Sequence, residues 1–399
     1  MHATKICIIG LGYVGMPLAQ LFSKKYETTG FDILTKTNNN FKCTTLIDDI
    51  KDCNVYIVAV PTPVDQNNNP DLEPLRLASR TVGKVISKND VVIYESTVYP
   101  GVTEEVCLPI IENVSQLKLN RDFFAGYSPE RINPGDDLHT IEKIIKITSG
   151  STPETADFVD LLYNSVLTNG TYKAPSIKIA EAAKIIENVQ RDVNIAFINE
   201  AAKIFNAMGI DTHDVLEAAS TKWNFINFKP GLVGGHCIGI DSFYLIHKAI
   251  ANGVVPEMTI SARKTNNSMA VYVAEQLIKC MNKKAVTVKN ADILILGFTF
   301  KENCSDTRNT KIFDIYKTLK EYTENIIIFD PHVDVQNIKD EYNIEISNQL
   351  PERKFDAIID CVGHQEFSNL DILSLKKSRN SVIYDIKGLL DRNIIDKRL

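Results

Sequence analysis

A cysteine in a glycine-rich run is the residue of this chain most suited to covalent chemistry. Cys237 lies in the sequence PGLVGGHCIGID, directly after His236 and four residues before Asp241. The flanking glycines leave steric room, and the neighbouring imidazole can favour the thiolate, the nucleophilic form of a cysteine. Such a thiolate can hold a covalent intermediate, so that one carbon is oxidised twice. The alternative is a buried structural cysteine, which is the commoner role of a free thiol.

A lysine and an asparagine form a second candidate pair. Lys184 and Asn188 are four residues apart, so on a helix they share one face. An ammonium beside an amide can stabilise a hydroxyl oxygen or a developing oxyanion, and one such donor contributes about 3 kcal/mol in a transition state. The alternative, which spacing alone favours, is a solvated helix face formed by Glu181, Lys184, Glu187 and Arg191.

Two loops that follow predicted strands carry candidate groups for proton transfer. Glu130 lies in GYSPERINPGD and Thr97 lies in ESTVYPG. Open α/β sheets bind ligands beyond the carboxyl ends of their strands, so Glu130 can orient a water or act as a base. Thr97 can hydrogen-bond that water or a cofactor, and Asp241 can orient Lys184 or a substrate hydroxyl. Turn or cap roles are the alternative for the loop residues.

A glycine fingerprint near the N-terminus predicts a dinucleotide site. The run from Gly10 through Gly12 to Gly15 follows a strand and opens a helix. Its glycines allow a tight turn, a close approach to a pyrophosphate and packing of helix on strand. Asp32 ends the next strand, where a carboxylate bonds both ribose hydroxyls and repels a 2′-phosphate. The pattern favours NAD over NADP; the alternative is a glycine turn with an incidental aspartate.

A basic segment follows a strand near the C-terminus. Lys301 and Arg308 lie in GFTFKENCSDTR, and positive groups on a glycine-bearing turn suit a diphosphate or a carboxylate. The alternative is a solvated surface loop.

The elements that position these residues alternate between strand and helix in both halves of the chain. This alternation indicates parallel βαβ units, and it predicts an α/β fold with two doubly wound domains. Between them, the uninterrupted helical spacing of 177–208 predicts one helix of roughly 45 Å. The predicted strands are 6–9, 28–33, 55–60, 91–95, 123–127, 144–148, 292–296, 326–329, 357–361 and 382–385, and the other predicted helices are 14–25, 214–219, 244–251 and 260–280.

Composition excludes several classes of protein. A length of 399 residues is too great for one core, and the net charge of −6 argues against a protein that coats nucleic acid. No apolar stretch reaches transmembrane length and Lys5 interrupts any signal-peptide core, so we expect a cytoplasmic protein. The eight cysteines show no metal-ligand spacing, which predicts free thiols and no metal.

Taken together, the motifs resemble the UDP-glucose/GDP-mannose dehydrogenase family. GLGYVG, PTPVD, ESTVYPG, GYSPERINPGD, EAAKIIENVQRDVNIAFINE, FKPGLVGGHCIGIDSFYL and GFTFKENCSDTRNTK occur in order along almost the whole chain. The motifs GYSPERINPGD and KPGLVGGHCIGID are most similar to those of the bacterial branch that acts on UDP-N-acetylhexosamines and makes uronic acids for surface polysaccharide. The resemblance implies a Rossmann-like NAD domain (1–175), a central helical domain with the cysteine loop (176–284) and a UDP-sugar-binding α/β domain (285–399).

The resemblance also implies an activity and an assembly. The activity is a four-electron oxidation of a sugar C6 alcohol to a carboxylate, with two NAD and one water consumed. The assembly is a homodimer with the long helix in its interface. Neither nucleic acid nor a membrane is expected as a partner. The alternatives are a UDP-glucose or GDP-mannose 6-dehydrogenase, a hydroxyacid dehydrogenase that uses a Lys/Asn pair, and a non-catalytic nucleotide-sugar sensor.

Carried onto this sequence residue by residue, the resemblance assigns three groups of side chains. Cys237 becomes the nucleophile, with Lys184, Asn188, Thr97, Glu130 and Asp241 as the other catalytic residues. The expected NAD contacts are Gly10, Gly12, Tyr13, Val14, Gly15, Asp32, Pro61, Thr62, Thr97 and Lys301. The expected substrate contacts are Glu130, Arg131, Asn133, Lys184, Asn188, Phe228, Lys229, Gly231, Gly234, Arg263 (toward a neighbouring subunit), Lys301 and Arg308.

One region departs from the family pattern. Relatives continue after the Asp32 position with a helix and a variable loop, whereas here 34–46 is short and rich in asparagine. Roughly two dozen residues are missing against the usual βαβ spacing. Asp32 itself is retained, so the shortening bears on how the adenosine side of the cofactor is packed.

Overall fold

The computed structural model describes residues 3–132, 140–235 and 238–399. The chain forms two compact units, one made of Met1–Asn188 with Phe243–Val255 and the other of Val189–Ser242 with Pro256–Leu399. The division falls inside the helix α5 (Ile177–Met208), whose bounds agree with the helix predicted from the sequence. The three-domain division stays a prediction, because the two ends of α5 fall in different compact units.

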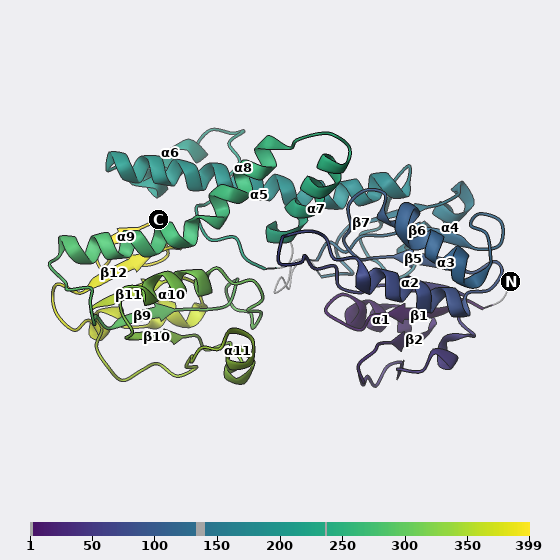
Figure 1. Cartoon of the computed structure of the whole chain (residues 1–399), viewed down its shortest axis with the longest axis horizontal. Helices are drawn as coiled ribbons and strands as arrows, with labels where there is room; N and C mark the ends of the chain where they lie inside the picture. Colours follow the sequence, from purple (N-terminus) through teal and green to yellow (C-terminus); the bar gives the residue numbers. More distant parts are fainter. Residues whose placement is uncertain (1–2, 133–139, 236–237) are drawn as a thin grey trace. The chain divides into compact units, whose positions relative to one another are not determined.

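The first unit is built on a largely parallel sheet whose strand order is β3-β2-β1-β4-β5-β6-β7-β8 (Figure 1). The order reverses between β1 and β4, which is the switch point where doubly wound sheets bind ligands. Strands such as VYIV and VVIY are buried along their whole length, as expected where helices cover both faces. The strands are β1 (Lys5–Ile9), β2 (Glu27–Phe31), β3 (Lys42–Thr44), β4 (Val55–Val58), β5 (Val91–Tyr94), β6 (Phe124–Tyr127), β7 (Lys146–Gly150) and β8 (Thr171–Lys173).

Helices of this unit pack on the sheet through an apolar core. The core joins Leu18 and Phe22 of α1 with Ile8 of β1, Ile57 of β4 and Val159 of α4. The helices are α1 (Gly15–Ser23), α2 (Glu73–Val85), α3 (Leu108–Ser115) and α4 (Pro153–Asn164), with short helical turns η1 (Ile47–Ile50) and η2 (Thr103–Cys107).

Two features of the first unit differ from a simple βαβ series. β7 runs antiparallel to β6, with Gly126 opposite Gly150, and an antiparallel neighbour needs no crossover helix. The connection 32–41 between β2 and β3 contains no helix. The short segment expected from the sequence is therefore a loop, and Phe41 at its end packs against the position where Gly30 lacks a side chain.

The second unit contains a wholly parallel sheet of order β10-β9-β11-β12-β13 (Figure 1). Its order also reverses, between β9 and β11, so the unit has a switch point of its own. The elements are β9 (Ile293–Leu296), β10 (Ile326–Phe329), β11 (Ala357–Asp360), β12 (Val382–Asp385), β13 (Lys397–Arg398), α6 (Thr212–Ser220), α8 (Glu257–Asn267), α9 (Met269–Lys283), α10 (Ile312–Lys320), α11 (Val335–Tyr342), η3 (Gln365–Asn369) and η4 (Ile372–Leu375), while α7 (Ile238–Ala251) belongs to both units.

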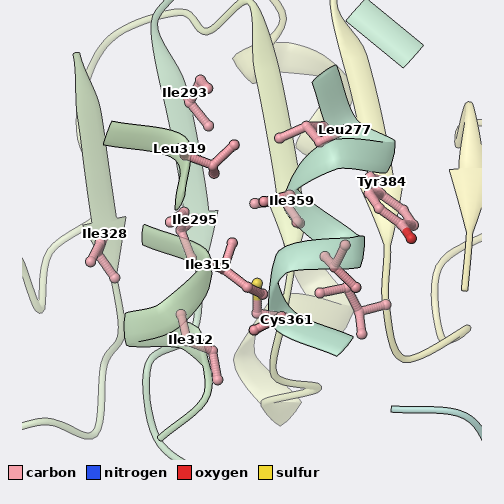
Figure 2. Packing of buried hydrophobic residues seen from close by; sticks show 14 of the residues in the cluster. Leu277, Ile293, Ile295, Ile312, Ile315, Leu319, Ile328, Ile359, Cys361 and Tyr384 are labelled. Atoms are coloured by element: carbon pink, nitrogen blue, oxygen red, sulfur yellow. The ribbon is translucent and has the colours of Figure 1, made fainter. Parts of the chain in front are cut away.

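Alternating side chains of the second sheet supply two apolar layers. Ile293 and Ile295 of β9 face a core that includes Leu277 of α9 and Ile315 of α10, as Figure 2 shows. Leu294, on the other face of the same strand, belongs to a separate core. The helices α9, α10 and α11 cover one face, and the short turns η3 and η4 contribute to the core on the other. With its parallel strands and the reversal in their order, this half of the chain is a second Rossmann-like domain, as predicted.

The helix predicted over 260–280 is interrupted. Ser268 ends α8 and precedes α9, and its hydroxyl donates to the Thr265 carbonyl at 2.7 Å. Asn266 meanwhile directs its amide to the carboxylate of Asp192. Side chains of this kind compete with regular helical bonding, which accounts for a break that apolar periodicity did not reveal.

Within the described residues, no helix is both long enough and apolar enough to cross a membrane.

Candidate functional site

The first glycine turn leaves open space where a pyrophosphate can approach the protein backbone. Gly10 has φ of +92°, and a β-carbon on Gly15 would lie 1.8 Å from the Gly10 carbonyl oxygen. By contrast, a β-carbon on Gly12 would meet no atom within 4 Å. The turn therefore requires glycine at Gly10 and Gly15 for its own packing, and at Gly12 it leaves room for a pyrophosphate.

The carboxylate of Asp32 lies beside this turn. Its Oδ2 accepts a hydrogen bond from the Leu11 amide at 2.7 Å, and its Oδ1 accepts one from the Leu34 amide at 2.9 Å. The side chain is half-buried, so each oxygen keeps a lone pair for a ribose hydroxyl. This donor and acceptor set fits NAD.

The other expected cofactor contacts of the first unit lie at the same edge of the sheet. Tyr13 and Val14 follow β1, Pro61 and Thr62 follow β4, and Thr97 follows β5. Each of these side chains is exposed or half-buried. Because β1, β4 and β5 are parallel neighbours, their carboxyl ends meet at one edge.

Glu130 is held rigidly in the loop after β6. Only 7% of the residue is exposed, and Oε1 accepts hydrogen bonds from the Arg131 amide at 2.6 Å and from the Ile132 amide. The other oxygen, Oε2, is buried without a partner among the described residues. A buried acceptor without a partner is costly unless a bound molecule satisfies it, so its placement agrees with the proposed role in binding a water or a substrate.

Lys184 and Asn188 do not lie on a solvated face. Each is only 7% exposed, so the alternative favoured by spacing alone is wrong for this part of α5. Glu187, between them in sequence, pairs with Arg131 at 2.7 Å. Arg131 also donates to the Ile145 carbonyl at 2.7 Å. This pair brings the Glu130 loop to the helix that carries Lys184 and Asn188.

A row of buried polar side chains continues along α5. Its members recur at intervals of three, four or seven residues, which places them on one helical face. No member is more than 7% exposed. The row consists of Glu181, Lys184, Asn188, Asp192 and Asn199.

Burial affects the titration of the first member of this row. Glu181 accepts hydrogen bonds from the amides of Gly101 at 2.5 Å and Thr103 at 2.9 Å. Burial raises the pKa of Glu181 to about 7, although these backbone donors oppose the rise. The carboxyl therefore couples α5 to the turn after β5, near Thr97.

Asp192 and Asn199 were missed by sequence reasoning, although their spacing from Lys184 and Asn188 was a usable signal. Asp192 accepts from Ser242 at 2.7 Å and from Arg263 at 2.9 Å. Arg263 is 3% exposed in this chain, and its expected contact with a neighbouring subunit stays a prediction. Asp241, next to Ser242, is also buried.

Asn199 fixes the loop that carries the expected substrate contacts. Its amide donates to the Gly231 carbonyl at 2.9 Å, and its carbonyl accepts from the Gly231 amide at 2.8 Å. Phe228 is half-buried and Lys229 is exposed. A β-carbon on Gly234 would lie 2.8 Å from the Asn309 carbonyl oxygen, so this loop packs against the segment that carries Arg308.

Two expected site residues, Cys237 and Asn133, lie outside the described residues, and their roles stay predictions.

A second glycine turn, similar to that at Gly10, follows β9 in the second sheet. Gly297 has φ of +87°, and its amide donates to Phe329 just as that of Gly10 donates to Phe31. Asp330 occupies the position that corresponds to Asp32.

Every oxygen of Asp330 is engaged within the protein. Oδ2 accepts from the amides of Phe298 and Thr299 and lies 3.0 Å from Nε2 of His364, while Oδ1 accepts from His332. Burial favours the neutral acid, but these hydrogen bonds outweigh it and hold the pKa of Asp330 below its usual value. Because Asp330 is also 0% exposed, this carboxylate is not available to a ribose.

His364 also orders the segment that carries Lys301. Its Nδ1 accepts from the Asn303 amide at 3.0 Å, and Thr299 links the ring to the Lys301 carbonyl through a 2.9 Å hydrogen bond. Lys301 is half-buried and Arg308 is exposed. Arg308 forms a forked ion pair with Asp306, with distances of 2.8 and 2.6 Å. Sequence reasoning missed His364, because a single histidine after a strand carried no pattern.

An NAD-type glycine turn with an open carboxylate, a buried Lys/Asn pair and a second doubly wound domain define a nucleotide-sugar dehydrogenase that uses NAD. The chain belongs to the UDP-glucose/GDP-mannose dehydrogenase family. Models of this family match its NAD binding domain at residues 25–167, its central domain at 178–268 and its UDP binding domain at 294–392.

Individual relatives match the chain over its whole length. It is 50% identical over 422 aligned positions to a UDP-N-acetyl-D-glucosamine 6-dehydrogenase of Pseudomonas aeruginosa, with 100% of each chain covered. It is 50% identical over 419 positions to the enzyme of the same name from Salmonella typhi, with 99% of this chain and 98% of that one covered. The solved UDP-D-ManNAc dehydrogenase of Pyrococcus horikoshii superposes with a TM-score of 0.89 at 27% identity, with 99% and 98% coverage.

The difference between Asp32 and Asp330 predicts one NAD site per chain. Asp32→Asn should weaken NAD binding at least about tenfold, because a charged acceptor to the ribose is lost. Asp330→Asn is the matched control: it should lower the melting temperature and leave NAD affinity unchanged. Titration calorimetry measures the NAD affinity and stoichiometry, and differential scanning calorimetry measures the melting temperature. A stoichiometry of two NAD per chain in the unaltered protein would contradict the assignment.

Proposed function

We propose that the chain oxidises the C6 alcohol of a UDP-N-acetylhexosamine to the carboxylate, with UDP-N-acetylglucosamine as the first candidate substrate. The observation that carries this proposal is the 50% identity, over the full length of both chains, to a protein named for that reaction. The retained motifs around Thr97, Glu130, Lys184, Asn188 and Asp241 support it.

UDP-N-acetylmannosamine is a second candidate, since the solved relative that superposes with a TM-score of 0.89 is named for that sugar. A UDP-glucose or GDP-mannose substrate is a further alternative within the family. A hydroxyacid dehydrogenase is disfavoured, because that class has no second α/β domain and this chain has one.

NAD would be held by the turn from Gly10 to Gly15, by Asp32 and by the segments after β4 and β5. When bound, it supplies the hydride acceptor for each of two oxidations. Because 32–41 is a loop, the protein surrounds the adenosine side with few residues. The alignment of 422 positions to a chain of 399 residues agrees with a loss of roughly two dozen residues.

In the proposed reaction, the protein's side chains act one after another. Lys184 and Asn188 hold the C6 oxygen, and the thiolate of Cys237 adds to the aldehyde carbon to give a thiohemiacetal. After the second oxidation the sugar carbon is a thioester. Glu130 and Thr97 then orient the water that releases the acid, while Asp241 keeps Lys184 in place. The covalent link prevents the aldehyde from escaping between the two oxidations.

The exposed face of α5 supports the expected homodimer. Ile179, Ile186, Phe197, Ile204 and Met208 are between 48% and 65% exposed. Their spacing places them on one face, opposite the buried polar row. An apolar stripe of this kind is typical of a helix covered by a partner. A cytoplasmic location and a role in surface polysaccharide synthesis complete the proposal.

Turnover with a panel of nucleotide sugars tests the substrate. The protein with NAD should form two NADH per UDP-N-acetylglucosamine, and UDP-N-acetylgalactosamine, UDP-N-acetylmannosamine, UDP-glucose and GDP-mannose serve as comparisons. Absorbance at 340 nm and mass detection of the acid measure the outcome. One NADH per sugar would favour a simple alcohol dehydrogenase, and no NADH with any sugar would favour a binding protein.

Replacement of the cysteine tests the covalent scheme. Cys237→Ser should lower the rate of acid release at least about a thousandfold, because an alkoxide at neutral pH is far scarcer than a thiolate. NAD affinity should be unchanged. Cys361→Ser, at a buried cysteine of the second sheet, controls for loss of a thiol elsewhere. A normal yield of acid from Cys237→Ser would exclude the thioester.

Insertion of a charge into the apolar stripe tests the dimer. Phe197→Glu should give a monomer in sedimentation equilibrium, because a carboxylate buried in an apolar interface lacks a partner. Arg191→Glu, at an exposed position on a different face of α5, should leave the assembly unchanged. A dimer that persists with Phe197→Glu would place the interface elsewhere.

A further inference from the structure

A fully buried ion pair lies behind the loops that carry Thr97 and Glu130. Lys146, the first residue of β7, and Glu95, the residue after β5, both have side chains that are 0% exposed, and Nζ lies 2.7 Å from Oε2. Neither residue is among the expected catalytic or ligand-binding groups. A buried pair of charges is rarely an efficient source of stability, because desolvation offsets most of the attraction.

The ammonium of Lys146 also reaches the loop before Glu130. It donates to the Pro129 carbonyl at 2.9 Å. The one ammonium therefore binds both Pro129, which precedes Glu130, and Glu95, which lies two positions before Thr97. The Glu130 amide in turn donates to the Glu95 carbonyl at 3.3 Å. The two loops are thus tied to each other and to β7 through Lys146 and Glu95.

The remaining oxygen of Glu95 is bound from the helix side. The hydroxyl of Tyr163 on α4 donates to Oε1, and the ring of Tyr163 lies 5.3 Å from the Lys146 ammonium. Tyr163 is itself 0% exposed. The Glu95 carboxylate therefore has a donor on each oxygen, and side-chain rotation would break both hydrogen bonds.

The charges balance only while the pair is intact. Burial raises the pKa of Glu95 to about 7, Lys146 lowers it, and the carboxylate of Glu130 raises it. Loss of Lys146 would leave the buried Glu95 carboxyl without the cation that binds it, while the repulsion from Glu130 remains. Lys146 thus allows a second buried carboxylate, that of Glu130, to remain in the same part of the sheet.

We propose that Lys146 and Glu95 are positioning residues for the reaction, which hold the Thr97 and Glu130 loops in register for the release of the acid. This inference rests on the proposed function, in which Thr97 and Glu130 orient the water. Neither Lys146 nor Glu95 contacts the substrate, because both side chains are entirely enclosed.

The double variant Lys146→Met/Glu95→Gln tests the proposal, since it removes both charges and keeps both shapes. Its kcat should fall at least about tenfold with little change in KM or in NAD affinity, because misplacement of a catalytic group by a fraction of an ångström impairs chemistry more than binding. An acyl adduct should accumulate on the protein in intact-mass spectra, since hydrolysis of the thioester becomes the slow step.

Thr148→Val is the matched control. Thr148 is buried two residues further along β7, and its hydroxyl donates to Asp160 on α4 at 2.7 Å without reaching the loops. This variant should lower the melting temperature and retain the kcat and the absence of an adduct. Tyr163→Phe removes only the hydrogen bond to Glu95. It should lower kcat about threefold, which keeps the proposal testable if the double variant does not fold.

Hydrogen exchange separates this proposal from the proposed function. Amides of 128–132 should exchange faster in the double variant than in the unaltered protein or in Thr148→Val, whatever the substrate is. Unchanged exchange and unchanged kcat in the double variant would overturn the positioning role while the dehydrogenase activity stands. If the unaltered protein oxidises no nucleotide sugar, the proposed function fails, and the exchange rates alone decide whether the pair orders the loop.

Discussion

The structure depends on one helix, α5, which buries a row of polar side chains among apolar ones and exposes an apolar stripe. Its buried face carries Glu181, Lys184, Asn188, Asp192 and Asn199, and its exposed face carries apolar side chains. Buried polar groups require partners, and several side chains of α5 bind particular loops. Glu181 binds the turn after β5, Glu187 binds Arg131, and Asn199 binds Gly231. This requirement sets where the loops of the candidate site lie along the helix.

The two doubly wound sheets show how one backbone design serves two purposes. Both have a glycine turn with positive φ and an acidic residue at the end of the next strand. Asp32 is half-buried beside a turn with open space, whereas Asp330 is fully buried and lies against His364. The second turn is consequently a support for the Lys301 segment, and the difference depends on burial and on the contact with His364.

Much of the architecture follows from patterns that are local in the sequence. Continuous apolar runs predicted the central strands of both sheets, and helical periodicity predicted the bounds of α5. Local patterns did not reveal the antiparallel β7 or the break at Ser268. These features arise from strand pairing and from side-chain hydrogen bonds, such as that of Asn266 to the distant Asp192, which carry no periodic signal.

For the site, the sequence by itself determined the types of chemical group and their order: the glycine turn with Asp32, the Glu130 loop, the Lys/Asn pair and the cysteine run. Only the tertiary structure decided which of them are buried. Spacing favoured a solvated face for Lys184, yet packing encloses it. Spacing likewise gave no reason to join Lys146 to Glu95 or His364 to Asp330. The reason is physical, since burial and pairing are set by contacts across the fold.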